Sequence, residues 1–227
     1  MIIAIDGPAG SGKSTIAQAV ARRLGLTFLD TGAMYRAVTL LAMEQGVSME
    51  DDAALGSLAL AMDLGFRPDP PRPPRVFLRE RDVTDAIRTP AVSQEVSLVA
   101  AHQSVRHALT LRQRELASKG DLVLEGRDIG TVVCPEATLK VYLTASVAER
   151  ARRRKEQLEG QGIHLCQDTL ERELQLRDSR DSERDVAPLR MAEDALPVDT
   201  TCLSIDQVVD RIAEAAGRVA ARREAEA

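Results

Sequence analysis

The sequence predicts an α/β fold in which a parallel sheet is covered by helices on both faces. Short apolar runs alternate with longer amphipathic runs along the 227 residues, which is the pattern of strand–helix repeats. A glycine-rich turn follows the first apolar run, and charged or hydroxyl-bearing residues follow later ones. With 44% hydrophobic residues the chain can build a full core, so we expect one domain over 1–227 with small insertions.

The first turn carries the most informative motif. Residues 2–5 predict a strand, and residues 12–24 predict a helix that stops at Gly25. Between them lies a match to G-x-x-x-x-G-K-[ST], a pattern in which backbone N–H groups surround a phosphate chain at a helix N-terminus. Lys13 would reach the outer phosphates, and Ser14 would offer a hard oxygen to Mg²⁺. The nucleotide-phosphate site is expected at Gly7, Pro8, Ala9, Gly10, Ser11, Gly12, Lys13, Ser14 and Thr15.

Composition argues against several classes of protein. A net charge of −5 and an aromatic content of 2% are atypical of nucleic-acid binders, so we expect no nucleic-acid partner. Cys134, Cys166 and Cys202 are widely spaced and form no C-x-x-C pair, which indicates neither a disulfide framework nor a zinc site. No apolar run approaches the roughly 18 residues of a membrane span. The first residues lack a basic leader. We therefore expect a cytoplasmic protein without a membrane partner.

The middle of the chain predicts an insertion. Ser48 to Asp51 form a capping-box pattern before a helix that reaches about Met62. Two short strands, at 63–66 and 75–79, flank the proline-rich segment 68–74, which we expect to be a surface loop of a small antiparallel insertion. Thr89-Pro90 then opens what reads as one long helix to about Lys119.

The second half returns to the strand–helix pattern. The strand at 122–124 delivers the polar segment 125–131 at its carboxyl end, where ligands of open parallel sheets bind. Another strand is predicted at 139–143, and Ser146 with Glu149 predicts a helix cap. The segment Gly160-Gln161-Gly162 is predicted to break the chain before a helix from about Asp168. The last strand is predicted at 202–205, before a helix capped by Asp206.

The remaining polar residues have two interpretations each. Thr31 and Arg36 could be a helix cap and a surface arginine, but their place after a strand end favours a functional role. The adjacent charges of Arg127 and Asp128 after a buried strand favour it further. A single arginine between Glu149 and Arg184 could equally lie on a solvated helix face. The histidines lack metal-ligand spacing and predict packing or surface positions: His102, His107 and His164.

Several blocks together resemble the bacterial cytidylate kinases. The glycine-rich motif alone is shared by very many nucleotide-binding proteins, whereas D-T-G-A-M-Y-R at 30–36 and G-R-D-I-G-T at 126–131, in this order, are specific. The resemblance covers nearly the whole chain. Glu125 stands where that family often has aspartate, and the proline-rich segment is unusual for it. The other matching blocks are Val96-Ser97, Val105-Arg106, Gln113-Arg114 and Arg177 to Arg184 followed by Val186-Ala187-Pro188-Leu189.

The resemblance implies that ATP, with Mg²⁺, phosphorylates CMP and dCMP to CDP and dCDP, in a cytoplasmic monomer of pyrimidine nucleotide metabolism. It implies a P-loop core with a nucleoside-monophosphate insertion over about 37–101 and a lid over about 150–185. The residues implied in catalysis are Lys13, Arg127, Arg177 and Arg184. Those implied in CMP binding are Thr31, Arg36, Arg88 and Arg127 near the acceptor phosphate, Ser97, Arg106 and Asp128 near the base, and Arg177, Asp181 and Arg184 near sugar or phosphate.

Two other functions remain open on the sequence. The nearer is another small-molecule P-loop kinase, acting for example on uridylate, adenylate or shikimate. The more distant is a GTPase-like switch, which needs D-x-x-G and N-K-x-D motifs after later strands. No aspartate in this chain is followed by glycine three residues later, and the segment 118–121, S-K-G-D, precedes its strand instead of following it. These features disfavour the switch.

Overall fold

The computed structural model describes residues 1–70, 72–160 and 162–226. Pro71 of the proline-rich segment, Gln161 of the predicted chain break and Ala227 lie outside the described residues. The chain forms two compact units. The first, here called the P-loop unit, comprises Met1–Leu29 and Asp121–Ala227; the second, here called the inserted unit, comprises Asp30–Gly120.

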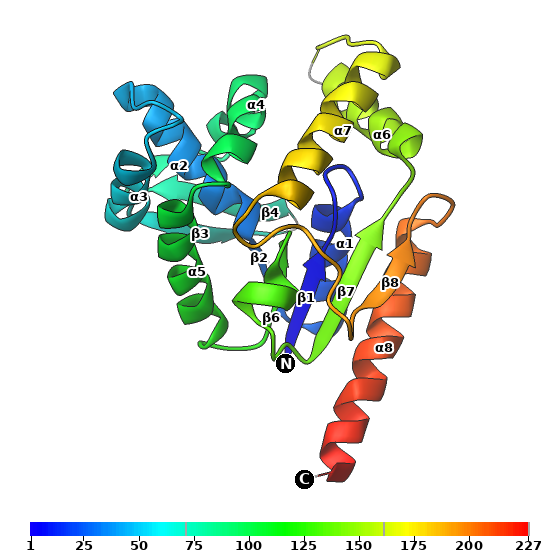
Figure 1. Ribbon diagram of the computed structural model, residues 1–227. Helices are drawn as coiled ribbons and strands as arrows, with labels where there is room; N and C mark the ends of the chain where they lie inside the picture. The colour runs from blue at the N-terminus through cyan, green and yellow to red at the C-terminus, as the bar shows by residue number, and fades with distance from the viewer. Residues whose placement is uncertain (71, 161, 227) are drawn as a thin grey trace. The chain divides into compact units, whose positions relative to one another are not determined.

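A five-stranded sheet forms the centre of the P-loop unit, in the order β2-β6-β1-β7-β8 (Figure 1). The central strand β1 pairs in parallel with β6 and β7, and β7 pairs in parallel with β8, which confirms the predicted parallel α/β sheet. The later strands lie on both sides of β1, with β6 and β2 on one side and β7 and β8 on the other. The glycine-rich turn follows this central strand. The strands are β1 (Ile2–Asp6), β2 (Thr27–Asp30), β6 (Leu122–Gly126), β7 (Leu139–Thr144) and β8 (Leu196–Asp199).

The core of the P-loop unit lies between the sheet and two helices, α1 (Lys13–Leu24) and α8 (Ile205–Glu226), which pack against each other. Ile3 and Ile5 of β1 point into this core. Because successive side chains of a strand point to opposite faces, the intervening Ala4 and Asp6 point to the other face of the sheet. Gly25 ends α1 in a left-handed conformation, as predicted.

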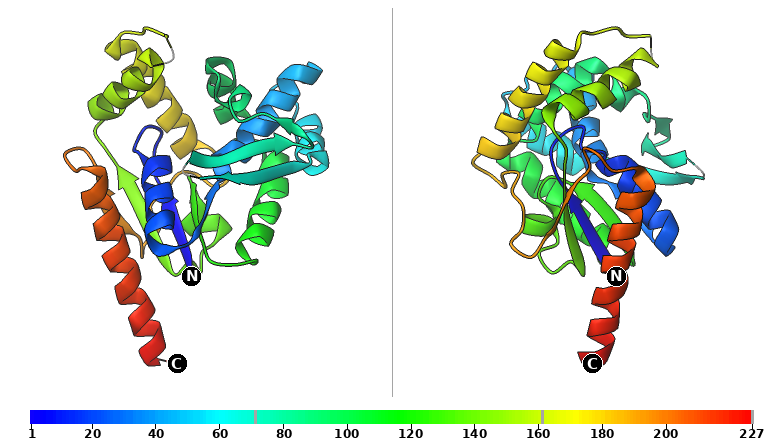
Figure 2. Two further views of the ribbon diagram at one scale, coloured as in Figure 1. Left: turned by 180° about the vertical axis from the view of Figure 1, so that it is seen from behind. Right: turned by 90° about the vertical axis from the view of Figure 1, so that its right-hand side faces the viewer.

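Two further helices of this unit, α6 (Val147–Glu159) and α7 (Gln167–Glu183), lie side by side in all views (Figures 1 and 2). They bury Ala151 and Leu170 together with Ala9 of the glycine-rich turn. Ser146 caps α6, since its Oγ accepts a hydrogen bond from the Glu149 backbone N–H, as predicted. The Glu149 carboxylate, however, accepts from Arg152 and Arg153 and closes no capping box.

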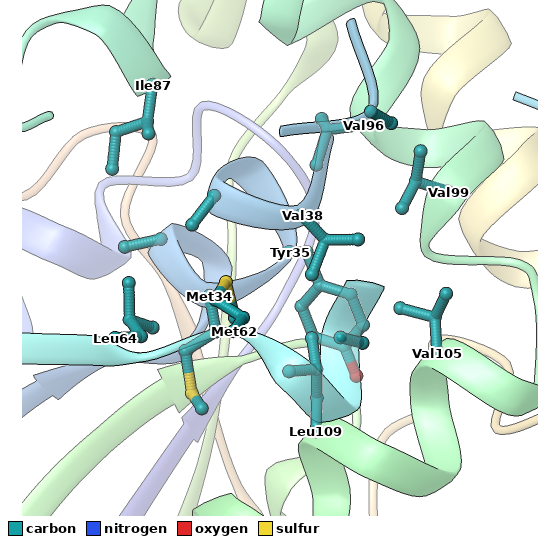
Figure 3. Close-up of a cluster of buried hydrophobic side chains, with 14 of the residues drawn as sticks. Met34, Tyr35, Val38, Met62, Leu64, Ile87, Val96, Val99, Val105 and Leu109 are labelled. Atoms are coloured by element: carbon teal, nitrogen blue, oxygen red, sulfur yellow. The ribbon is translucent and has the colours of Figure 1, made fainter. Parts of the chain in front are cut away.

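The inserted unit combines helices with a small antiparallel sheet in the order β3-β4-β5. Its core is shown in Figure 3, where Met34, Tyr35 and Val38 of α2 lie among side chains of α4 and α5. The elements are α2 (Thr31–Gln45), α3 (Asp52–Ala61), β3 (Leu64–Asp69), β4 (Arg72–Leu78), β5 (Arg81–Asp82), the 3₁₀ turn η1 (Ala86–Arg88), α4 (Pro90–Val99) and α5 (Gln103–Ala117).

Several predicted boundaries in the inserted unit are wrong. The single helix expected over 90–119 divides into α4 and α5, because His102 adopts an extended conformation and its Nε2 lies 2.8 Å from the Met49 carbonyl oxygen. Asp51, rather than Ser48, caps α3 by accepting from the Ala54 N–H. The proline-rich segment is largely strand, since β3 extends to Asp69 and β4 begins at Arg72. At its proline end β4 pairs only with β3, and an edge of this kind tolerates proline.

The last strand was also misplaced by the prediction. Residues 202–205 form a turn and the start of α8, and the strand is β8, which contains Pro197. Proline argues against a central strand, but β8 lies at the edge of the sheet. Ser204 and Gln207, rather than Asp206, cap α8 by exchanging side-chain and backbone hydrogen bonds. Within 1–70, 72–160 and 162–226, no helix combines the length and apolarity needed to cross a membrane.

Candidate functional site

The glycine-rich turn places bare backbone at the carboxyl end of β1. Gly7, Gly10 and Gly12 all have positive φ angles. A Cβ atom on Gly7 would lie 2.1 Å from the carbonyl oxygen of Leu143, so this close approach to β7 requires glycine. Gly12 is the N-cap of α1 and offers no side chain to the first turn of the helix. The first N–H groups of α1 therefore face the turn, in the arrangement that binds phosphate.

Lys13 is the central charge of this turn. Its side chain is buried, and its Nζ donates a hydrogen bond to the Pro8 carbonyl oxygen at 2.7 Å. Burial lowers the pKa of Lys13 well below its usual range, and the positive charges of Arg127 and Arg177 lower it further. Arg127, in the turn after β6, and Arg177, on α7, thus both lie close enough to Lys13 to repel its charge. A polyphosphate bound between them would relieve this repulsion.

A hydroxyl and a carboxylate meet beside Lys13. Ser14 Oγ donates to Glu125 Oε2 at 2.9 Å, and Glu125 is buried near the end of β6. Both are hard oxygen ligands of the kind that Mg²⁺ prefers, so the pair fits a divalent cation. The sequence predicted Ser14 alone for the metal. Glu125 could have been included because it directly follows the apolar run 122–124, although its partner lies 111 residues away in the chain.

The turn after β6 is joined to α7 by two ion pairs. Arg127 Nε donates to Asp181 Oδ2 at 2.8 Å, and Arg184 Nη2 lies 3.6 Å from Asp128 Oδ1. Burial raises the pKa of Asp181, but the charges of Arg127 and Arg177 outweigh it and leave that pKa below its usual value. The structure therefore brings together Lys13 of the glycine-rich turn and five of the predicted site residues from later in the chain: Arg127, Asp128, Arg177, Asp181 and Arg184.

Arg150 is a residue whose position the sequence did not reveal. Its Nη1 donates to the Ala9 carbonyl oxygen at 3.0 Å and lies 2.6 Å from Asp178 Oδ2. The buried guanidinium thereby connects the glycine-rich turn to α7, which carries Arg177 and Asp181. Nothing in the run of basic residues on α6 distinguishes Arg150 from its neighbours, because its role depends on contacts distant in the chain.

The inserted unit gathers a second group of predicted residues around the start of α2. Asp30 caps this helix by accepting from the Ala33 N–H at 3.0 Å, and its other oxygen accepts from Arg88 at 3.0 Å. Thr31 is the first residue of α2 and is buried. Arg36, on the same helix, donates to Ser93 Oγ at 2.8 Å. Two arginines and a hydroxyl thus lie near the N-terminus of one helix.

The base-directed residues of the prediction lie in the same unit. Ser97 is buried on α4, one turn after the serine that Arg36 contacts. Arg106 of α5 is only 3% exposed, and its guanidinium carbon lies 5.5 Å from the centre of the Tyr35 ring. Its Nη1 also donates to the Ala100 carbonyl oxygen at 3.2 Å. The side chain is therefore held in one orientation by α2 and by the α4–α5 connection.

Comparison with known proteins identifies relatives over nearly the full chain. The family model described as cytidylate kinase matches residues 3–218. A cytidylate kinase of Exiguobacterium sibiricum is 54% identical over 94% of this chain and 96% of its own length. One of Carboxydothermus hydrogenoformans is 50% identical over 96% and 98%. A bifunctional pantoate ligase/cytidylate kinase of Parasynechococcus marenigrum is 51% identical over 94% of this chain but 43% of its own.

Solved structures agree on the fold. A gluconokinase from Sinorhizobium meliloti superposes with a TM-score of 0.50 at 16% identity, covering 99% of this chain and 96% of its own. An uncharacterized protein from Eubacterium ventriosum gives a TM-score of 0.52 at 11% identity, covering 96% and 98%. At these identities the likeness concerns the fold alone. It agrees with an α/β kinase fold built on the glycine-rich phosphate turn.

Proposed function

Because the chain belongs to the cytidylate kinase family, we propose that it transfers the γ-phosphoryl group of ATP to CMP and dCMP, giving ADP with CDP or dCDP. The observation that carries the proposal is the meeting of Lys13, Arg127 and Arg177 beside the glycine-rich turn. Phosphoryl transfer requires alignment of the phosphates and neutralisation of their charge, and needs no covalent catalyst. These three cations supply that charge.

In this proposal the turn formed by residues 7–15 holds the phosphates of ATP. Lys13, Arg127, Arg177 and Arg184 contact the transferred phosphoryl group. Mg²⁺ would be held through Ser14, with Glu125 beside it, and when bound it would neutralise charge on the ATP phosphates. Arg127 and Arg184 exchange their contacts with Asp181 and Asp128 for contacts with phosphate when both nucleotides bind. Helices α6 and α7, which include most of the predicted lid over about 150–185, then exclude water and prevent ATP hydrolysis.

The proposed CMP contacts fall into groups according to the part of the nucleotide that they would bind. We assign Thr31, Arg36, Arg88 and Arg127 to the acceptor phosphate, because a helix N-terminus with nearby arginines favours an anion. Ser97, Arg106 and Asp128 would contact the base, and Asp181, Arg177 and Arg184 the sugar or phosphate. The nucleoside-monophosphate insertion is expected over about 37–101. We also propose that the protein is a cytoplasmic monomer of pyrimidine nucleotide metabolism with no nucleic-acid partner; its net charge of −5 supports the last point.

The proposal is tested by measuring ADP release from ATP with a panel of acceptors. CMP and dCMP should be used with far higher kcat/KM than UMP, AMP or shikimate. Removing Mg²⁺ with a chelator should abolish turnover with every acceptor. Shikimate or AMP as the preferred acceptor would identify another small-molecule kinase. ADP release that no acceptor stimulates would instead indicate a nucleotide hydrolase.

The lid assignment makes a separate prediction. Arg177→Ala should lower kcat by on the order of a hundredfold, because it removes a cation that stabilises the transition state. Arg72→Ala, at the exposed start of β4, serves as the matched arginine control and should leave kcat and KM unchanged. Steady-state kinetics of both variants distinguish the two positions. If Arg72→Ala were as damaging as Arg177→Ala, the division into a catalytic lid and a peripheral hairpin would be wrong.

A further inference from the structure

Asp6 is a buried carboxylate that the proposed reaction does not yet use. It ends strand β1 and is 5% exposed. Its two oxygens accept one hydrogen bond each, Oδ1 from the Ile129 N–H and Oδ2 from the Gly130 N–H, both at 2.8 Å. The carboxylate thus joins the strand that precedes the glycine-rich turn to the segment that follows β6, 123 residues later in the chain.

The segment that Asp6 holds is η2 (Ile129–Val133), a single π-helical turn. Its internal bonds run from Val132 and Val133 to the Asp128 carbonyl oxygen and from Cys134 to the Ile129 carbonyl oxygen. The N–H groups of Ile129 and Gly130 start the turn and have no earlier turn of helix to bond to. Aspartate at an N-cap usually satisfies such groups with its own carboxylate.

Asp128 occupies this N-cap position but makes no side-chain cap. Its carboxylate is directed toward Arg184, 3.6 Å away, and Asp6 supplies the cap from another strand. Asp6 therefore accepts the two cap hydrogen bonds that the Asp128 carboxylate would otherwise accept. An aspartate side chain readily forms hydrogen bonds with backbone N–H groups close to it in the chain.

We propose that Asp6 is a positioning residue: by capping η2 from strand β1, it holds the Asp128 carboxylate in the orientation that recognises the base of CMP. The inference rests on the proposed function, in which Asp128 contacts the base. When Asp6 cannot accept both hydrogen bonds, Asp128 is the adjacent carboxylate that can cap the buried N–H groups. It then turns away from the base.

The charges around Asp6 make its ionisation sensitive to pH. The titratable groups that act on it are Lys13 of α1, Asp128 before η2, and Tyr142 of β7, which pairs with Asp6 in the sheet. Burial raises the pKa of Asp6 to about 6, although its two backbone hydrogen bonds and Lys13 oppose the rise. Protonation turns one acceptor oxygen into a donor, so the cap is complete above this pKa and is lost as the pH falls through it.

The test uses Asp6→Asn in the full-length protein and reads out the ratio of kcat/KM for CMP to that for UMP. The amide keeps the size of the side chain but can accept from only one of the two N–H groups. We expect kcat/KM for CMP to fall by on the order of ten- to a hundredfold, the CMP/UMP ratio to fall toward that of Asp128→Ala, and KM for ATP to stay unchanged. Asp51→Asn, the same chemical change at the exposed cap of α3, is the control and should alter neither value.

A double mutant separates this positioning role from general destabilisation. If Asp6 acts through Asp128, adding Asp6→Asn to Asp128→Ala should not lower the CMP/UMP ratio further. In the wild type the ratio should fall as the pH drops through about 6, whereas in Asp6→Asn it should be constant between about pH 5.5 and 8. The phosphates of CMP and UMP titrate alike, so their ionisation cancels in the ratio.

A folded Asp6→Asn variant with the wild-type ratio would overturn the inference, and so would multiplicative effects in the double mutant. If Asp6→Asn does not fold, the wild-type pH profile decides, and a constant ratio from about pH 5.5 to 8 would overturn the inference. A wild type that uses UMP as readily as CMP would instead refute the base contact of the proposed function, and with it the role of Asp6.

Discussion

Replacing Lys13 with methionine should lower turnover by on the order of a thousandfold or more, because in the proposed mechanism it removes a charge that acts on the transferred phosphoryl group. Methionine keeps an apolar stem of similar length, so the fold should survive. Burial and the charges of Arg127 and Arg177 lower the pKa of Lys13, which means that its charged form destabilises the folded protein without phosphate. The melting temperature of Lys13→Met without nucleotide should therefore equal or exceed that of the wild type.

Lys119→Met is the matched control for this experiment. Lys119 is exposed after the end of α5, and its Nζ contacts Glu115 one turn earlier at 2.6 Å. A surface pair of this kind contributes little to stability. We expect wild-type kcat and KM for Lys119→Met under the same conditions. Turnover of Lys13→Met within about tenfold of the wild type would remove Lys13 from the proposed mechanism.

The choice of base should depend on Asp128 and Arg106. Cytosine presents an amino donor beside a ring-nitrogen acceptor, and uracil presents the reverse pair. In the proposed site Asp128 accepts from the amino group, while Arg106 donates to the ring nitrogen or the adjacent carbonyl oxygen. UMP would set its own carbonyl oxygen against the carboxylate and leave both side chains without partners. The wild type should therefore favour CMP over UMP in kcat/KM by on the order of a thousandfold.

The burial of both side chains makes this discrimination strong. Asp128 is 4% exposed and Arg106 is comparably covered, so water cannot replace a lost partner at low cost. Asp128→Ala and Arg106→Met should each reduce the CMP/UMP ratio by on the order of ten- to a hundredfold. Arg81→Met, at an arginine whose partner is the exposed Glu44, should leave the ratio unchanged. An unchanged ratio in both site variants would refute the assignment of the base contacts.

The sequence predicted the parts of the site that depend on local pattern. The strand, glycine-rich turn and helix at the start of the chain are contiguous, and the three glycines of the motif, Gly7, Gly10 and Gly12, all have positive φ. The polar segment 125–131 was also located, because the buried apolar residues 122–124 of β6 precede it directly. The Thr89 cap and the proline in the first turn of α4 are likewise local signals.

The pairing of site residues could not be predicted in this way. Arg127 and Asp181 are 54 residues apart, and the cap that Asp6 provides to Ile129 spans 123 residues. The break between α4 and α5 contains neither glycine nor proline and depends on the contact of His102 with the Met49 carbonyl oxygen. Strand β8 was not predicted, because it contains Pro197. Proline is acceptable in a strand only at the edge of a sheet, and the order of the strands is not a local property of the sequence.

The central claim is that a phosphoryl group passes from ATP to CMP. It is tested most directly with ATP that carries a radioactive label in its γ-phosphate, by measuring which product receives the label. Wild-type protein incubated with this ATP, Mg²⁺ and an equimolar mixture of CMP and UMP should place the label in CDP, with one CDP formed for each ATP consumed. The Lys13→Met variant should leave the label in ATP. Label released as inorganic phosphate, or divided equally between CDP and UDP, would contradict the account.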